Sequence, residues 1–343
     1  MKKTKTYIFR GISIVLFISI VLASLYLVSN TLIMKRTDGI TTMKVLYAQP
    51  KDSVDLLVLG SSHAGMNLDA GVFWDEYGIS SYMLWGSVQP YWNSYYFLEE
   101  ALKTQSPRVV LLETYASTFT FEYSDDARQI TNVCGMKFSK TKWNAIKAST
   151  PEENWENFVF GLPLWHSRYG ELTENDFSYY PWTEDLELEK GTGIRTAKGG
   201  FTALADVTDM KDTKPLHEKE EKYLRMIIEL CQDRKIPIVL YNSATVDRAK
   251  EQPYYNRTAE IAKEYGVTYF NMNVIDKETG ILPSDVWQDN HHLNASGAAK
   301  ISKYLGKYID EKYDLPDHRK DAYYSSWEAF AQMSREKRKA NAN

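Results

Sequence analysis

The sequence predicts an α/β protein, a three-layer α/β/α sandwich around a mostly parallel five-stranded sheet, which is carried on an N-terminal transmembrane helix. Two observations lead to this prediction. Short apolar runs alternate with stretches of helical periodicity, which is typical of a parallel sheet covered by helices. One long uncharged run near the N-terminus has the length of a membrane span.

The composition of the 343-residue chain is that of a folded protein, with 43% hydrophobic and 25% charged residues. Its 41 Lys and Arg against 45 Asp and Glu give a formal net charge of −4. This balance supplies no basic surface for counterion-release binding, so we expect no nucleic-acid partner. Cys134 and Cys231 are too few for a disulfide framework and lack metal-ligand spacing, and the sequence does not decide whether they pair.

Residues 11–34 form the predicted transmembrane segment, because they contain no charged residue over 24 positions. At about 1.5 Å per residue, a helix of this length spans the ~30 Å hydrocarbon layer. A cleaved signal peptide is the alternative, but its apolar region would be about 7–15 residues long and would end in a small-residue cleavage site. This run is longer and ends at Lys35 and Arg36, and no cysteine lies near it for lipid attachment. We therefore expect an uncleaved, single-pass anchor.

Basic residues set the expected topology. Lys2, Lys3, Lys5 and Arg10 precede the apolar run, so the positive-inside rule places residues 1–10 in the cytoplasm and the large domain outside the cell membrane. The expected divisions are a cytoplasmic N-terminus at 1–10, an anchor at 11–34, a linker at 35–53, a folded domain at 54–315 with an insertion at about 116–215, and a charged tail at 316–343.

The elements of the domain follow from local patterns. The run VDLLVLG at 54–60 ends on glycine, as a buried strand that closes in a turn does. Similar apolar runs predict four more strands, at 79–84, 108–113, 236–241 and 267–271. Helices are expected at 94–104, 216–234, 258–265 and 295–308, where apolar residues recur at helical spacing.

Between Thr114 and Leu216 the alternation stops and aromatic residues accumulate. We expect this stretch to form an insertion or cap over one edge of the sheet. Its segment 165–169 has the residue types of a polar binding surface, although an ordinary packed corner of the cap is the favoured interpretation. The basic run at 335–339 is expected to be a solvated helix end. The aromatic residues of the insertion include Trp143, Trp155, Trp165, Tyr179, Tyr180 and Trp182.

The first chemical motif is Gly60-Ser61-Ser62-His63, at the end of the first predicted strand. In an open parallel sheet, ligands bind beyond the carboxyl ends of the strands. A hydroxyl there is well placed to react, although serine is a weak nucleophile that needs a base within hydrogen-bond reach. By itself the tetrapeptide also fits a simple helix cap.

The second motif is the segment from Asp289 to Ala298, just before the last predicted helix, for which Asn294 is the expected N-cap. An aspartate three residues before a histidine can fix the tautomer of the imidazole. The other ring nitrogen is then free to take the proton of a serine. His292 keeps this spacing and His291 does not, so we assign the base to His292.

Together these residues resemble the SGNH/GDSL hydrolase superfamily over about residues 54–115 and 216–312. The resemblance implies that Ser62 is the nucleophile, His292 the base and Asp289 the residue that orients it. It further implies an oxyanion hole formed by the backbone N–H groups of Ser62 and Gly86. Ser61 stands where the usual first block has aspartate, and the third block is missing, since Glu113-Thr114-Tyr115 occupies its place.

Four further side chains near these motifs remain open to interpretation. His63 follows the nucleophile directly, and we expect it to have a structural or substrate-facing role, because neighbouring residues on a turn seldom aim their side chains at one another. Trp85, Trp92 and Trp287 lie next to the proposed catalytic segments and could stack on sugar rings, although burial in the core explains most tryptophans and is the favoured interpretation.

The anchor and the Gly-Ser-Ser motif are similar to those of membrane-anchored members of the superfamily that act in D-alanylation of lipoteichoic acid and in polysaccharide O-acetylation. This likeness implies a serine acyl-ester hydrolase or O-acyltransferase of the cell envelope that acts on a glycan or teichoic acid. It also implies a multi-pass membrane-bound O-acyltransferase as the partner, and chemistry that needs no metal or cofactor. A non-catalytic polymer-binding subunit is the alternative, favoured by the missing third block. A scaffolding protein of the envelope is the third reading.

Overall fold

The computed structural model describes residues 2–35, 38–178 and 186–342. At its centre lies a five-stranded sheet in the order β2-β1-β3-β4-β5, and all neighbouring strands are parallel. The predicted α/β class and parallel sheet are therefore confirmed. Each predicted strand overlaps an observed one: β1 (Leu56–Gly60), β2 (Ser81–Trp85), β3 (Val109–Glu113), β4 (Ile238–Asn242) and β5 (Thr268–Asn271).

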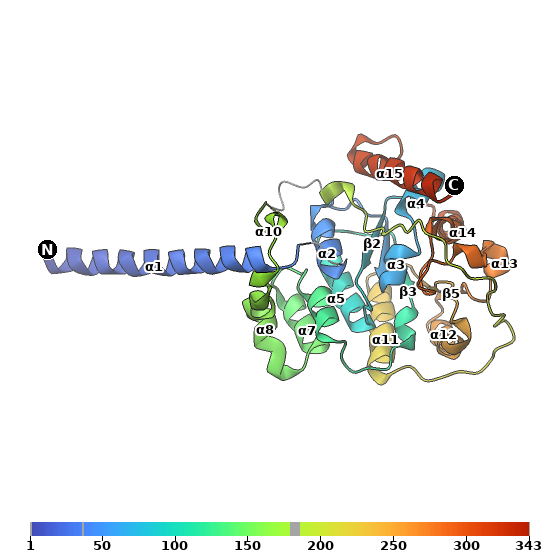
Figure 1. Cartoon of the computed structure of the whole chain (residues 1–343), viewed down its shortest axis with the longest axis horizontal. Coiled ribbons are helices and arrows are strands. Elements are labelled where there is room, and N and C mark those ends of the chain that lie inside the picture. The colour runs from blue at the N-terminus through green and yellow to red at the C-terminus, as the bar shows by residue number, and fades with distance from the viewer. Residues whose placement is uncertain (1, 36–37, 179–185, 343) are drawn as a thin grey trace.

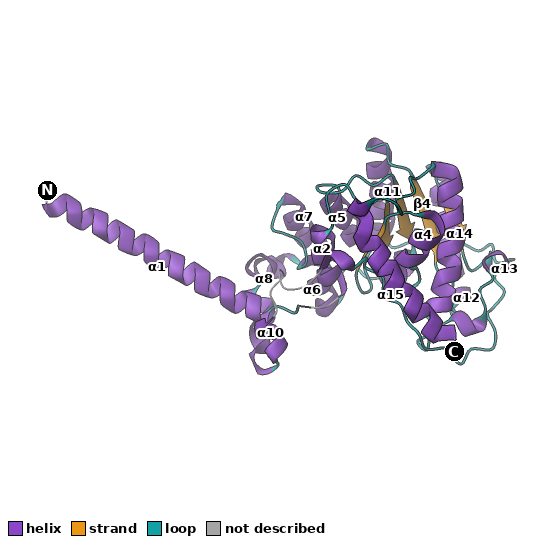
Figure 2. Ribbon diagram, turned by 90° about the horizontal axis from the view of Figure 1, so that it is seen from above, coloured by secondary structure: helices purple, strands orange, loops and turns teal. Residues whose placement is uncertain are grey.

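Helices surround this sheet and join its strands (Figure 2). The helices in the first part of the described chain, including α1, which projects away from the sheet (Figure 1), are α1 (Lys2–Leu32), α2 (Asp38–Ala48), α3 (Ser62–Met66), α4 (Ala70–Tyr77), α5 (Tyr91–Ala101), α6 (Asp126–Val133), α7 (Lys140–Ser149), α8 (Trp155–Phe160), α9 (Leu162–Trp165) and α10 (Glu174–Ser178). The later helices are α11 (Glu218–Asp233), α12 (Arg248–Glu264), α13 (Asp276–Thr279), α14 (Ala295–Tyr313) and α15 (Ser325–Ala342).

Successive side chains of a strand point to opposite sides, and β1 to β4 are buried on both faces, whereas β5 is half-buried. Leu57 and Leu59 of β1 belong to one core cluster, which also contains side chains of α2, α5 and α11. Leu56 and Val58 belong to a second cluster with side chains of α3, α4 and α14. This two-sided burial explains why the strands read as continuous apolar runs in the sequence.

α12 begins ten residues before the predicted helix start at Thr258. Pro253 lies inside it and interrupts the helical pattern in the sequence. Tertiary contacts hold its first turn in place: the buried guanidinium of Arg248 donates to the carbonyl of Thr245 at 3.1 Å and pairs with Asp276 at 2.8 Å.

The C-terminal segment packs on the domain as α15. Trp327 is fully buried and its indole N–H donates to the carbonyl of Ser81 at 3.0 Å. Arg338 forms ion pairs of 2.6 Å with Asp69, the N-cap of α4, and with Asp75, which lies inside α4. The expectation of a solvated end at 335–339 is therefore wrong for Arg338, because its acidic partners are remote in sequence.

α1 projects away from the rest of the molecule in both views (Figures 1 and 2). Its residues Tyr7–Leu32 are long and apolar enough to cross a membrane, as predicted, and no other helix of the described chain meets that condition. Side chains such as Phe17 are 67% exposed. Between β3 and β4 the described residues form helices and loops without a strand, and Tyr179, Tyr180 and Trp182 lie outside the described residues.

Candidate active site

The turn after β1 places Ser62 at the carboxyl edge of the sheet. Gly60 has a φ of +150°, and a Cβ added there would lie 2.6 Å from the Cβ of Glu113. Only glycine fits this bend. Ser61 then caps α3, because its Oγ accepts a hydrogen bond from the backbone N–H of His63 at 3.3 Å. Ser62 follows as the first residue of α3.

A second loop, between the 3-10 turn at 283–285 and α14, brings Asp289 and His292 to the same edge. One carboxylate oxygen of Asp289 accepts the backbone N–H groups of His291 (3.1 Å) and His292 (3.0 Å). The N–H of Trp287 donates to the carbonyl of His292 at 2.8 Å. These local bonds fix the position of the imidazole relative to the carboxylate.

Ser62, His292 and Asp289 form one hydrogen-bonded chain. The imidazole Nε2 of His292 lies 2.8 Å from Ser62 Oγ, across 230 sequence positions, and its Nδ1 lies 2.5 Å from Asp289 Oδ2. Because the carboxylate can only accept a hydrogen bond, Nδ1 carries the ring proton of the neutral imidazole and Nε2 is the acceptor. The predicted contacts between these three side chains are therefore present.

The environment keeps the imidazole of His292 neutral. Burial, assisted by the nearby His63, lowers its pKa to about 4, although Asp289 acts in the opposite direction. Burial raises the pKa of Asp289, but the hydrogen bonds from His292 and its backbone outweigh that effect, so the pKa of Asp289 lies below its usual value. An ionised carboxylate, a neutral imidazole and a hydroxyl are the protonation states that general-base activation of serine requires.

The other two histidines of the motifs do not take the place of His292. The ring of His63 lies 4.1 Å from that of Tyr115 and 5.1 Å from that of His292, edge-on, so His63 packs beside the base. His291 Nδ1 is buried and has no hydrogen-bond partner among the described residues. The choice of His292 over His291 and His63 thus agrees with the geometry.

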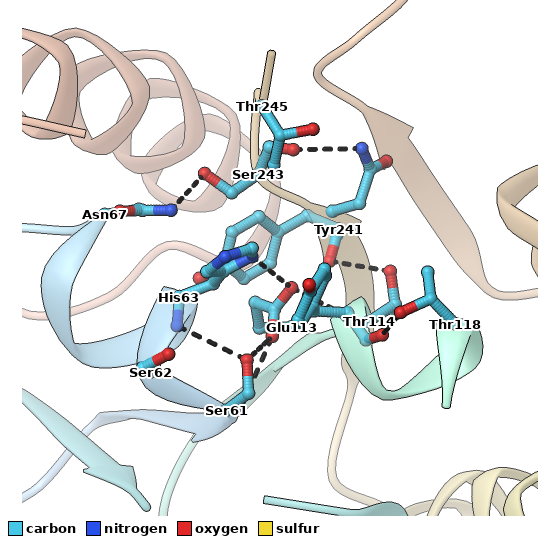
Figure 3. A network of polar contacts seen from close by, with 12 residues as sticks. Ser61, Ser62, His63, Asn67, Glu113, Thr114, Thr118, Tyr241, Ser243 and Thr245 are labelled. Carbon is cyan, nitrogen blue, oxygen red and sulfur yellow. Dashed lines mark hydrogen bonds and ion pairs between the residues drawn. The ribbon is translucent and has the colours of Figure 1, made fainter. Parts of the chain in front are cut away.

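A buried carboxylate lies behind the nucleophile turn (Figure 3). Glu113, at the end of β3, is fully buried and accepts the hydroxyl of Ser61 at 2.9 Å and the N–H of Tyr115 at 2.7 Å. The oxygen that accepts from Tyr115, Oε1, lies 3.7 Å from His63 Nδ1. Glu113 therefore holds the turn that carries Ser62. The sequence signal was the single acidic residue that closes the apolar run at 108–113.

Asn67 connects the segments that carry Ser62 and His292, and Figure 3 shows its contact with Ser243. Its fully buried amide donates to Ser243 Oγ at 2.8 Å, and its oxygen accepts the N–H of Leu293 at 2.7 Å. Leu293 directly follows His292, so this hydrogen bond holds the backbone at His292 at a fixed position relative to α3. No pattern in the sequence indicated this role.

Gly86 follows β2 directly, and its neighbour Trp85 pairs with Gly60 at the end of β1. A side chain at Gly86 would overlap the amide oxygen of Asn132, which would be 1.9 Å from the added Cβ. A larger residue at this position would therefore have to displace the buried side chain of Asn132.

Two of the three candidate sugar-stacking tryptophans are buried. Trp85 is 5% exposed and donates its indole N–H to Gly191, and Trp92 is 1% exposed in the core. Neither offers a face to a polymer, so the stacking interpretation is wrong for both. Trp287 is half-buried, and the guanidinium carbon of Arg195 lies 5.0 Å from its ring centroid.

Arg195 is a cation beside the triad that the sequence analysis missed. Its Nη2 lies 3.6 Å from the sulfur of Met66, which is one helical turn from Ser62 on the same face of α3. Its Nε is buried and has no hydrogen-bond partner among the described residues, and the guanidinium interacts electrostatically with Asp38. The cation therefore lies beside Met66 and Trp287, in the two segments that carry Ser62 and His292.

Neither a metal centre nor a known relative identifies the site. Within residues 2–35, 38–178 and 186–342, no group of three or more His, Cys, Asp or Glu side chains could hold a metal ion. Both Cys134 and Cys231 are free thiols. No protein-family model matches the chain, and no curated protein matches its sequence.

Proposed function

We propose that the chain is a serine acyl-ester hydrolase or O-acyltransferase that acts outside the cell membrane on a cell-envelope polymer. The observation that carries the proposal is the hydrogen-bonded chain from Ser62 through His292 to Asp289 at the carboxyl edge of the sheet. Serine needs such a base to become a nucleophile, and the base needs an orienting carboxylate.

In the proposed mechanism Ser62 Oγ attacks an ester or thioester carbonyl while His292 Nε2 takes its proton. The backbone N–H groups of Ser62 and Gly86 stabilise the oxyanion. The imidazolium is stabilised by Asp289 and returns the proton to the leaving alcohol or thiol, which leaves an acyl-enzyme. In the second step His292 activates water, for hydrolysis, or a polymer hydroxyl, for transfer. The residues named supply all of this chemistry.

The two core clusters on opposite faces of the sheet support assignment to the three-layer SGNH/GDSL architecture. Within that family the chain is unusual at two coupled positions. The first block has Ser61 instead of aspartate, and Glu113 stands at the place of the third block. Because the hydroxyl of Ser61 donates to Glu113, the second change accompanies the first.

The anchor and Arg195 favour an anionic polymer as the substrate. α1 would hold the domain at the outer face of the membrane, with residues 1–10 in the cytoplasm, where it could work beside a multi-pass membrane-bound O-acyltransferase. Arg195 could bind a phosphate or carboxylate of a teichoic acid or acidic glycan through several parallel hydrogen bonds.

Labelling with a fluorophosphonate probe tests the proposal. We expect the full-length protein in detergent micelles to be labelled, and Ser62→Ala to lose the label. Ser87→Ala is the matched control, since Ser87 lies on the loop after Gly86 at the same edge, and it should label normally. Unchanged activity of Ser62→Ala on acylated envelope polymer would refute the assignment, and polymer binding without turnover would favour the non-catalytic subunit.

A further inference from the structure

The segment from α8 to α10 packs around the end of α1 that enters the domain (Figures 1 and 2). Trp165 of α9 is buried against Leu32 and Ile40. The guanidinium of Arg168, in the 3-10 helix η3 (His166–Gly170), donates to the carbonyl of Leu32 and to Asp176 of α10. A cation at the C-terminal carbonyls of a helix is favourable. Within the segment 165–169, Trp165 and Arg168 thus pack against the end of α1, and they fix the direction of α1 relative to the domain.

The contacts with α1 lie at the level where a bilayer would end. A Cβ added at Gly161 would lie 4.0 Å from Ser29 Oγ, so the α8–α9 junction approaches a residue of the uncharged run. The run of 24 residues at 11–34 is about 36 Å long as a helix, about 6 Å more than the hydrocarbon layer. If the run begins at the cytoplasmic boundary, the hydrocarbon layer ends near residue 30. The turn Ser29–Leu32 then lies at the headgroup boundary.

The elements at this level carry exposed apolar side chains. Tyr169 is 77% exposed, Phe177 of α10 is 61% exposed and Val159 of α8 is 36% exposed. Among the described large apolar residues outside α1, Tyr169 has the highest exposed fraction. Aromatic residues with such exposure are enriched at membrane–water interfaces, where one side of the ring is apolar and the other hydrated.

We propose that Val159, Tyr169 and Phe177 form an interfacial surface that contacts the headgroup region of the bilayer. The occupant is lipid rather than a protein, because the surface is continuous with the helix that would cross the membrane and lies at the level of its outer end. Glu171, which is 73% exposed in the same segment, keeps the contact at headgroup depth. The surface fixes the orientation of the catalytic domain on the membrane, beyond the tethering that α1 supplies.

This inference rests on the membrane anchor of the proposed function, so the experiment tests the two separately. The photo-cross-linker p-benzoylphenylalanine replaces one aromatic residue at a time in the full-length protein in native membranes, and lipid adducts are detected after irradiation. Phe177 and Tyr169 are the test positions. Phe17 in α1 is the positive control. Phe138 is the matched negative control, since it is 65% exposed.

We expect Phe138 to lie away from the membrane level. Its neighbour Lys137 donates its N–H to Tyr47, at the opposite end of α2 from Ile40, and Ile40 belongs to the apolar cluster that contains Trp165 of α9. We expect lipid adducts at positions 17, 169 and 177 but not at 138. Adducts at 17 without adducts at 169 and 177 would overturn the interfacial surface and leave the anchor standing. The absence of adducts at 17 would overturn the anchor and this inference with it.

Discussion

Asn67→Ala tests whether the link between the two loops positions the base. The substitution removes two hydrogen bonds, to Ser243 and from the N–H of Leu293, which is then left buried without a partner. The bond to Ser243 contributes about 1 kcal/mol, and leaving the buried N–H of Leu293 without a partner costs about 1–3 kcal/mol. We therefore expect the free energy of unfolding to fall by about 2–4 kcal/mol. Because His292 precedes Leu293, turnover should also fall by about tenfold or more, since small misplacements of catalytic groups are costly.

Gln105→Ala is the matched control. Gln105 is 1% exposed and its oxygen accepts the N–H groups of Ser53 (2.9 Å) and Val54 (3.2 Å), before β1 and far from the triad edge. Urea unfolding of the full-length proteins in micelles should give similar losses of stability for both variants, with kcat lowered only by Asn67→Ala. Equal turnover of the two variants at equal destabilisation would refute the positioning role of Asn67.

Two further predictions concern the nucleophile turn and the pH profile. Gly60→Ala should lower the free energy of unfolding by at least about 2 kcal/mol in urea titrations, because alanine is strained at this φ and its Cβ would meet Glu113. Gly170→Ala is the control and should be near neutral, since a Cβ there meets no atom within 4 Å. Equal effects of the two substitutions would contradict the reasoning. Because the pKa of His292 is lowered to about 4, the acid limb of kcat/KM should lie near pH 4, well below the ordinary value of histidine, and His63→Gln should move it upward by removing the electrostatic effect of His63 on His292. Because His292 binds its proton more tightly in the unfolded chain than in the folded protein, the free energy of unfolding should also fall as the pH falls from about 6.5 to 4. An acid limb of kcat/KM near pH 6.5 in the unsubstituted protein would show that His292 is not desolvated as described.

Local patterns were sufficient to predict the strands, because β1 to β4 are buried on both faces and are therefore short apolar runs bounded by turns. The Asp-x-x-His spacing also predicted the contact between His292 and Asp289, whereas the pairing of Ser62 with His292 was implied by the resemblance to the SGNH/GDSL superfamily. The start of α12 was not predictable in this way. Pro253 disfavours a helix locally, and only the contacts of Arg248 with Thr245 and Asp276 overcome that preference.

The sequence by itself determined the uncharged length of α1, the succession of strands along the chain, the parallel class of the sheet, and the residue types of the triad, because these depend on periodicity and short spacing. The order of the strands within the sheet came from the structure. Only the tertiary structure decided that Glu113 supports Ser61, that Asn67 ties Leu293 to Ser243, and that α15 packs on α4. The physical reason is that each of these is a buried polar or aromatic contact between segments remote in the chain. Such contacts depend on where the fold brings two groups together out of water. The local pattern of a sequence carries no information on the spatial distance between two groups that are far apart in the chain.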